Sequence, residues 1–451
     1  MGRRLAAGAL VTIVLCAAGC SNSTGSSATT GGPGGTTSST TSFAAGSPWT
    51  GTLVPVALPA PVNATVATTC ATATDCWAVG STVGSDGAPN GAAVIATTNG
   101  GTSWVAQAIP ATVGFLSAIA CSTARQCVAA GQGQATQGVV ITTTNGGTTW
   151  TQGALPAGVT DVTAVECQAG VQCMAVGSTA SGDVALTSTS AGAPWTQVGA
   201  LPAAVGGVRS IACVGATDCW VTGYTLTDAD HVSGVVLQTT TGGTTWLALP
   251  LPVVAGYLNG VSCVVGPDDA AGTIPASTVP IAAPATVPTG GAGSATTTTV
   301  VPTGTSTTTS TTAPAPATSS TAPAPPGAGD AGVRCTVVGT TADTVVGVRS
   351  GHALVLTTAN GGATWAAPTV TTTAASLLGV SCTADATCVS VGNTVLSTPQ
   401  AGLIVFTGPT DRAWSRSSVV LTPQSLTGVD CVSTSRCVVV GESLTEHLAG
   451  S

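Results

Sequence analysis

The chain has 451 residues, of which only 6% are charged, and its 9 basic residues against 17 acidic ones give a net charge of -8. This balance excludes a nucleic-acid-binding protein, which needs a basic surface to attract phosphates. With 59 Gly, 27 Pro and 3% aromatic residues, the composition also excludes long amphipathic helices and favours short strands joined by turns.

Residues 1–19 have the pattern of a secretion signal. Arg3 and Arg4 form the charged region, and the apolar stretch 5–19 is too short to span a membrane as a mature helix. The segment ends in Ala-Ala-Gly-Cys, which resembles a bacterial lipobox, and this resemblance implies that Cys20 becomes the lipidated first residue of the mature protein. The alternative is an ordinary signal peptide cleaved near the same small residues. Both interpretations predict an exported chain.

Residues 20–46 follow as a tether rich in Ser, Thr and Gly, a composition that cannot bury a core. We therefore expect the folded domain to begin near residue 47 and to extend to residue 451.

The 16 cysteines are spaced regularly. Cys16 lies in the leader and Cys20 is the lipidation candidate, which leaves fourteen. Cys335 is followed four positions later by Gly, as is every other second cysteine, so it pairs with Cys263 across an insertion. In an exported chain we expect seven disulfides. The expected pairs are Cys70 and Cys76, Cys121 and Cys127, Cys167 and Cys173, Cys213 and Cys219, Cys263 and Cys335, Cys382 and Cys388, and Cys431 and Cys437.

A metal site is a poor interpretation of these cysteines. Zinc sites use tighter spacing, often with His, and the chain has 3 His. We expect neither a metal nor a cofactor.

A Trp-containing segment precedes each later cysteine pair. The clear copies are Asn/Thr-Gly-Gly segments ending in Trp at residues 99–104, 145–150, 241–246 and 360–365, and degenerate copies end at Trp195 and Trp414. The next first cysteine follows the Trp by 17 residues in five cases and by 18 after Trp195.

The pattern around these markers predicts four strands per unit. Apolar residues alternate before the first cysteine, a short apolar run follows the second, and another, such as residues 139–141, precedes the turn. First cysteines recur 46 to 51 residues apart outside the insertion. Seven such units predict an all-β protein, a seven-bladed β-propeller over residues 47–451 with one disulfide-bridged hairpin per blade.

The turn ending in Trp resembles the Asp-box of sialidase-like (BNR) repeats, with Asn replacing Asp in three copies. The seven-unit count is similar to that of the photosystem II assembly and stability factor group, a non-catalytic branch of that superfamily. The resemblance implies a turn between the third and fourth strands, with its side-chain oxygen bonded to backbone amides. This structural role is favoured over sugar binding.

Residues 267–332, within blade five, consist mostly of Thr, Pro, Ala, Ser and Gly without periodicity. We expect a disordered insertion, either a passive low-complexity expansion or an O-glycosylated spacer.

Propeller topology places the cysteine hairpins and Trp turns on one face. We expect ligand loops on the other, around residues 81–90, 225–231, 340–352 and 393–400. Asp228, Asp230 and His231 form a compact polar cluster that has the oxygen ligands for a cation. A solvated loop is the favoured interpretation.

The chain lacks a convincing catalytic set. A sialidase needs an arginine cluster, a Tyr nucleophile with a Glu base, and an acidic Asp. Tyr occurs only at Tyr224 and Tyr257, and the few Glu residues include Glu166, directly before a hairpin cysteine. We expect a membrane-anchored, non-catalytic propeller that binds or scaffolds an extracytoplasmic protein or glycan. The alternative is a glycoside hydrolase acting on extracellular polysaccharide through two carboxylates.

The last cysteine unit has no Trp after it, and the missing copy lies near the N-terminus. The segment ending at Trp49 resembles the degenerate turn ending at Trp195, and Trp49 precedes Cys70 by 21 residues. We therefore predict that the Trp49 segment forms the outer strand of blade seven, so that both chain ends close one ring.

Overall fold

The computed structural model of the chain describes residues 11–16, 41–42, 52–84, 89–168, 172–202, 205–226, 232–266, 332–341, 352–371, 374–384, 387–394, 401–406, 414–420, 425–433 and 436–442. The chain divides into two compact units, Met1–Asp269 with Pro325–Ser451, and Ala270–Ala324. The second unit falls within the expected insertion and lies outside the described residues. All regular structure in the described part of the first unit is β-strand, as expected.

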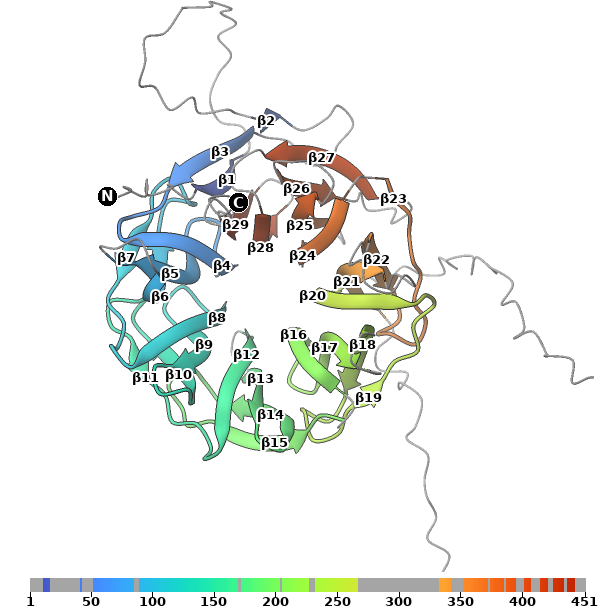
Figure 1. The fold of residues 1–451 in the computed structure, drawn as a ribbon, viewed down its shortest axis with the longest axis horizontal. Helices are drawn as coiled ribbons and strands as arrows, with labels where there is room; N and C mark the ends of the chain where they lie inside the picture. Colours follow the sequence, from blue (N-terminus) through green and yellow to red (C-terminus); the bar gives the residue numbers. More distant parts are fainter. Residues whose placement is uncertain are drawn as a thin grey trace, which may run out of the picture. The chain divides into compact units, whose positions relative to one another are not determined.

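The described strands form seven sheets around a central axis (Figure 1). We number the sheets by the chain order of their innermost strands. Sheet one comprises β4 (Val62–Cys70), β5 (Cys76–Val83), β6 (Pro89–Thr97) and β7 (Val105–Gln107). Sheet two comprises β8 (Val113–Cys121), β9 (Cys127–Gly133), β10 (Gly138–Thr143) and β11 (Thr151–Gln152). Sheet three comprises β12 (Val159–Cys167), β13 (Cys173–Thr179), β14 (Gly182–Ser188) and β15 (Thr196–Ala200). Sheet four comprises β16 (Val205–Val214), β17 (Asp218–Leu226), β18 (Val232–Thr239) and β19 (Leu247–Ala248).

The remaining sheets depart from this simple order. Sheet five comprises β20 (Ala255–Val265), β21 (Val333–Thr341) and β22 (Ala353–Thr358). Sheet six comprises β24 (Ala374–Cys382), β25 (Cys388–Thr394), β26 (Ala401–Phe406), β27 (Trp414–Val420) and, at its outer edge, β23 (Val370–Thr371). Sheet seven comprises β28 (Ser425–Ser433), β29 (Arg436–Glu442), β1 (Val11–Cys16), β3 (Thr52–Ala57) and β2 (Thr41–Ser42), in that order.

Sheet five has a fourth position filled by a single bridge, between Thr357 and Ala366. Pro368 follows two residues later and has no N–H for a continuing ladder. The chain then pairs as β23 with β27 of the next sheet, in parallel.

The expected disulfide-bridged hairpins are confirmed. In each sheet a disulfide joins the end of the innermost strand to the second strand, with Cα atoms 4.0 to 4.1 Å apart. Cys263 and Cys335 form the same bridge across a separation of 72 positions. Their strands pair directly, so the insertion leaves the hairpin register intact.

The glycine four positions after each second cysteine faces a β-bulge in the innermost strand. In sheet two the register shifts between Leu116 and Ala118, and a Cβ atom on Gly131 would clash with the carbonyl oxygen of Phe115. The equivalent glycines of the other sheets with described surroundings meet the same obstacle: Gly80, Gly177, Gly223, Gly339 and Gly392. The recurring glycine is thus required by the bulge.

In the turns that end in Trp, side-chain oxygens accept hydrogen bonds from backbone amides of the same turn. Asn99 Oδ1 accepts the amide of Ser103 at 3.0 Å, and Thr97 Oγ1 accepts the amide of Gly101 at 3.0 Å. Gly100 and Gly101 have φ of 69° and 83°, a region that favours glycine. The amide of Gly100 also donates to Thr74 in the cysteine hairpin, so turn and hairpin share one face of the propeller.

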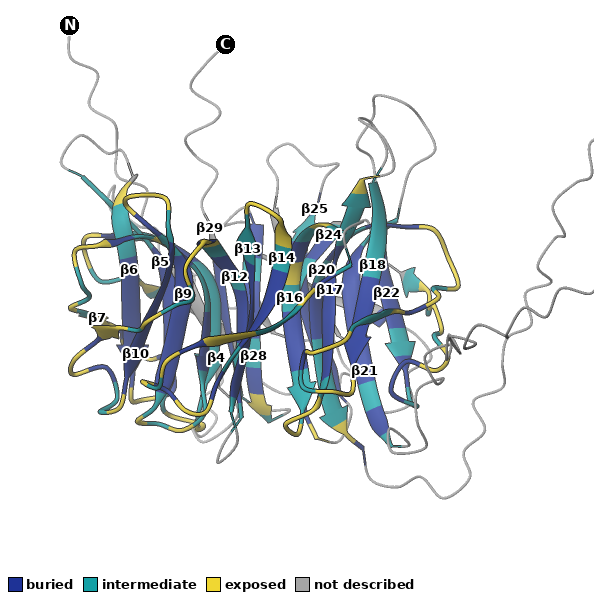
Figure 2. Ribbon diagram, turned by 90° about the horizontal axis from the view of Figure 1, so that it is seen from below, coloured by how far each residue is buried: buried dark blue, intermediate teal, exposed yellow. Residues whose placement is uncertain are grey.

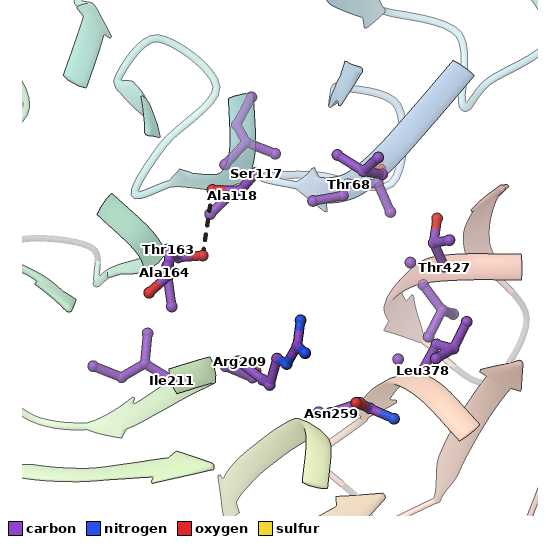
Figure 3. Close-up of a pocket in the computed structure, with 18 of the residues that line it drawn as sticks. Thr68, Ser117, Ala118, Thr163, Ala164, Arg209, Ile211, Asn259, Leu378 and Thr427 are labelled. Carbon is purple, nitrogen blue, oxygen red and sulfur yellow. Dashed lines mark hydrogen bonds between the residues drawn. The ribbon is translucent and has the colours of Figure 1, made fainter. Parts of the chain in front are cut away.

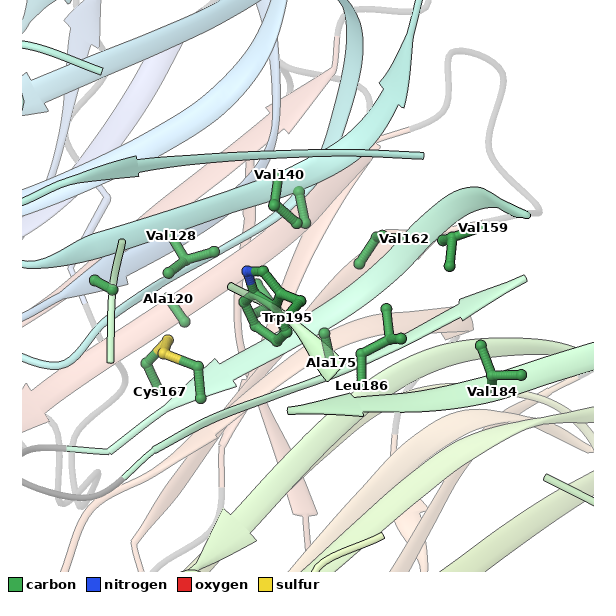
Figure 4. Packing of buried hydrophobic residues seen from close by; sticks show 14 residues of the cluster. Ala120, Val128, Val140, Val159, Val162, Cys167, Ala175, Val184, Leu186 and Trp195 are labelled. Atoms are coloured by element: carbon green, nitrogen blue, oxygen red, sulfur yellow. A yellow bond between two sulfur atoms is a disulfide. The ribbon is translucent and has the colours of Figure 1, made fainter. Parts of the chain in front are cut away.

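Buried residues concentrate along the strands (Figure 2), and their side chains form an apolar core between neighbouring sheets. Trp195 of sheet three is 4% exposed and packs with Val128 and Val140 of sheet two and with Leu186 of its own sheet (Figure 4). Each sheet therefore depends on its neighbours for burial, as in repeat proteins.

Sheet seven combines strands from both ends of the chain. Trp49 lies outside the described residues, but β3 begins three residues later and shares the sheet with β28 and β29. The expected leader and tether also contribute: β1 lies between β29 and β3, and β2 pairs with the outer edge of β3. Among the residues that the structure describes, no helical segment has the length and apolarity to cross a membrane.

Replacing Gly131 with Ala should lower the free energy of unfolding by about 1–3 kcal/mol, because the methyl group overpacks the bulge. Gly91→Ala is the matched control, since its Cβ would meet only Thr82 Oγ1 at 3.4 Å. Denaturant unfolding with the disulfides intact measures both variants. Equal stabilities would contradict this role of the bulge.

Candidate functional site

The bulges line a cavity on the propeller axis. In each sheet the extra residue of the bulge stands four positions before the first cysteine and borders a cavity of about 210 Å³ (Figure 3). The seven residues are Val66, Ser117, Thr163, Arg209, Asn259, Leu378 and Thr427. Because a bulge leaves its extra residue unpaired in the ladder, that residue is free to face the axis.

Arg209 is the charged member of this bulge ring. Its side chain is exposed and extends from β16 into the cavity (Figure 3). The guanidinium carbon lies 5.4 Å from the ring centroid of Tyr224 and 5.8 Å from that of Tyr257. The two tyrosines contact each other edge to face, with centroids 4.9 Å apart. These cation–π contacts hold the guanidinium in place while leaving its N–H donors available.

The hydroxyl groups of the bulge ring are engaged within the propeller. Ser117 Oγ donates to the carbonyl of Val162 in the next sheet at 3.1 Å. Thr427 Oγ1 donates to the carbonyl of Thr65 at 3.2 Å, which joins sheet seven to sheet one. Among the described residues, no carboxylate forms an ion pair with Arg209. This guanidinium is therefore the strongest candidate for a contact with a ligand.

A second ring lies closer to the cysteine hairpins. It consists of the residues directly before the first cysteines, and it borders a cavity of about 300 Å³. Its members are Thr69, Ala120, Glu166, Ala212, Ser262, Ser381 and Asp430. We call this the cysteine ring.

Asp430 of the cysteine ring joins neighbouring sheets. Its Oδ2 accepts the amide of Cys70 at 2.6 Å, and its Oδ1 accepts the hydroxyl of Ser381 at 3.2 Å. Burial raises the pKa of this carboxyl, and these hydrogen bonds act in the opposite direction. With its oxygens bonded to the propeller on both sides, Asp430 has a structural role.

Glu166 is the second carboxyl of the cysteine ring. Burial, followed by the charge of Asp430, raises the pKa of Glu166 to about 8. The acid form is therefore the more populated one at neutral pH.

Most of the residues singled out in the sequence for ligand binding lie outside the described residues. They are Asp228, Asp230 and His231 and much of the four expected ligand loops; the lipidation candidate Cys20 also lies outside the described residues. The part of the chain that the structure describes contains no group of three or more His, Cys, Asp or Glu side chains placed to hold a metal.

Sequence patterns alone do not predict the axial site. They do not single out Arg209, and they offer Tyr224 and Tyr257 only as possible nucleophiles. The position of Arg209 in the repeat is the signal that identifies it. The residue four positions before each first cysteine is the extra residue of the bulge and faces the axial cavity.

Antiparallel sheets whose innermost strands surround an axis define a β-propeller. No family model matches the sequence, and no curated protein matches it either. The solved structure of YCF48 bound to a D1 peptide has a similar fold, with a TM-score of 0.50 and 11% identity over 90% of this chain and 97% of that one. The likeness shows the fold alone.

Two further solved structures are more distant. A GH74 xyloglucanase from Xanthomonas campestris has a TM-score of 0.43 and 11% identity, over 78% of this chain and 46% of that one. U3-55K has a TM-score of 0.44 and 6% identity, over 84% of this chain and 95% of that one.

Replacing Glu166 with Gln should change the pH dependence of stability. Because the folded pKa of about 8 lies above the ordinary Glu value of 4.5, this group stabilises the fold fully below pH 4.5 and progressively less up to about pH 8. Relative to the wild type, Glu166→Gln should therefore gain about 2 kcal/mol or more between pH 5 and pH 8. Unfolding curves measured across this range test it, and parallel pH profiles would contradict it.

Proposed function

We propose that this protein is an exported, non-catalytic β-propeller that binds an acidic, extended segment of an extracytoplasmic protein at its axial cavity. The observation that carries the proposal is Arg209, whose guanidinium contacts the rings of two tyrosines while its side chain borders the cavity. A guanidinium forms its strongest hydrogen bonds with carboxylates.

The size of the cavity supports a side chain or chain end as the ligand. At about 210 Å³ it is smaller than the 300–1,000 Å³ of typical small-molecule sites. A protein segment would place one carboxylate beside Arg209 and make its other contacts with the surrounding face. YCF48, a propeller of similar fold, was solved with a bound peptide, which accords with this mode of binding.

The disulfides support an extracytoplasmic location. Seven bridges within one folded unit require an oxidising environment to form and persist. They accord with the export that the expected leader implies. The resemblance to a lipobox alone supports an anchor to the outer side of a membrane through lipidated Cys20.

A glycoside hydrolase is the second candidate. It is favoured by the raised pKa of Glu166, which suits a general acid. The hydrogen bonds of Asp430 disfavour it, because a partner carboxylate needs free oxygens. Glu166→Gln would abolish polysaccharide hydrolysis if this candidate were correct and would leave peptide binding unchanged under our proposal.

Arg209→Gln should weaken binding of acidic peptides by about tenfold or more, because it removes the charge-assisted hydrogen bonds. The probe is a set of fluorescent twelve-residue peptides, each compared with a copy in which Asn and Gln replace Asp and Glu. Arg209→Lys should retain part of the affinity. Arg125→Gln, at an exposed residue in a cysteine hairpin, is the matched control. Equal affinity for the acidic and neutral peptides would contradict the proposal.

Cys20→Ser should release the protein from the membrane fraction of the expressing cells. Mass spectrometry of the wild type should find a diacylglyceryl-modified Cys20 at the mature N-terminus. An unmodified N-terminus at another residue would show simple secretion instead.

A further inference from the structure

The third strand of sheet seven comes from the expected leader. β1 pairs antiparallel with β29 on one side and with β3 on the other. Leu15 lies opposite Cys437 in β29 and opposite Leu53 in β3. A strand that export would remove therefore stands in the middle of a sheet.

Removal of β1 leaves a gap with a defined direction. Since β29 and β3 are both antiparallel to β1, they run parallel to each other at about twice the strand spacing, roughly 9.5 Å. Their facing N–H and C=O groups lose their partners. Only a strand that runs in the direction of β1 can restore antiparallel pairing with both.

β2 already has this direction. It pairs antiparallel with β3, but on the outer edge, where Thr41 lies opposite Leu53 and Ser42 opposite Thr52. To reach the gap, β2 would have to cross β3, the strand beside which it lies.

The repeat spacing identifies β2 as the end of a third strand. In sheets one to five the third strand ends seven residues before the Trp of the following turn. These strand ends are Thr97, Thr143, Ser188, Thr239 and Thr358, before Trp104, Trp150, Trp195, Trp246 and Trp365. β2 ends at Ser42, seven residues before Trp49.

The register of sheets one to five indicates that the place held by the leader belongs to β2. The last third-strand residue lies opposite the second cysteine in these pairs: Cys76 and Thr97, Cys127 and Thr143, Cys173 and Ser188, Cys219 and Thr239, and Cys335 and Thr358. The same rule places Ser42 opposite Cys437, where Leu15 stands.

The pairing of the third strand with the fourth strand follows a second rule. The residue eight before the Trp pairs with the residue directly after it, as Ala96 with Val105 and Thr142 with Thr151. Applied to Trp49, this rule places Thr41 opposite Thr50, three residues from its present partner Leu53.

The side chains of the repeat agree with this register. The hydroxyl at the strand end accepts the amide of the glycine three residues before the Trp, as Thr143 does from Gly147 at 2.8 Å and Thr358 from Gly362 at 2.9 Å. The sequence has Ser42 and Gly46 at these two positions relative to Trp49.

We propose that β2 replaces β1 as the third strand of sheet seven when the leader is removed, shifting by three residues along β3. The proposal rests on the export and leader removal that the proposed function includes. In the full chain the leader is the more apolar candidate for this place: Ile95, Ile141 and Leu186 are fully buried nine residues before their Trp, whereas Thr40 has this position before Trp49.

Hydrogen exchange tests the exchange of strands in three proteins: the full chain, a protein beginning at residue 20 with Cys20→Ser, and one beginning at Phe43. The amides of β29 that face the third strand, and not those bonded to β28, should be protected in the first two and exchange about 100-fold faster or more in the third, because that protein has no third strand. Amides of Thr41 and Ser42 should be protected within the sheet in the leaderless protein. Rapid exchange of β29 in the leaderless protein would overturn the proposal and would leave the gap open to a strand of another chain.

Thr41→Pro distinguishes whether β1 or β2 occupies the gap. Proline has no N–H donor, so it disrupts a strand that pairs on both sides. In the leaderless protein it should expose the amides of β29 to exchange, and in the full chain it should leave them protected. Thr29→Pro, upstream of the strand, should have no effect on β29 in either protein. The same response to Thr41→Pro in both proteins would overturn the proposal. These measurements involve neither a peptide ligand nor a membrane. A negative result for peptide binding at Arg209 or for lipidation of Cys20 is therefore distinguishable from a negative result for the replacement of β1 by β2.

Discussion

The fixed register between the two innermost strands of each sheet is the constraint on which the rest of the structure depends. A disulfide fixes one end of this strand pair, and a glycine facing a bulge fixes the other. A slip by one residue would turn every side chain to the opposite face. With the register locked, the bulge residue of each sheet faces the axis at the same height. The axial cavity is therefore a direct product of the cross-linked hairpins.

The scarcity of charge makes the few charged groups near the axis informative. Contacts between sheets rely on hydroxyl groups and backbone amides, as in the bonds from the amide of Cys431 to Ser381 and from the amide of Cys382 to Ser262. Such bonds need no counter-ion and cost less to bury than charges. Against this neutral background Arg209 borders one axial cavity and Glu166 borders the other, so one cavity has a cationic group and the other a protonatable one.

Much of the fold could be predicted because each repeat is marked by residues that have a single structural role. The cysteine pairs, the Trp turns and the alternation before them identified the hairpins and the all-β class. The bulges could not be predicted, since a bulge depends on a carbonyl approaching a glycine across two strands, and the sequence shows only the glycine. Arg209 was missed for that reason. The pairing of residues 11–16 within a sheet was also unexpected, because an apolar leader and a buried strand have the same composition. The single bridge at the edge of sheet five depends on Pro368, which the repeat pattern alone did not single out.

The bridge between Cys263 and Cys335 has a consequence for the covalent continuity of the chain. Elsewhere the disulfide and the backbone connect the same two strands over almost equal paths, with a separation of 6 positions. In sheet five the backbone path is 72 positions long, and the disulfide is the shorter connection. A proteolytic cut anywhere between these cysteines would leave the two parts of the propeller joined, both by that bond and by the ladder between β20 and β21. The intervening segment could thus be cleaved, shortened or lost in the extracytoplasmic space while the propeller remained one molecule until the bond was reduced.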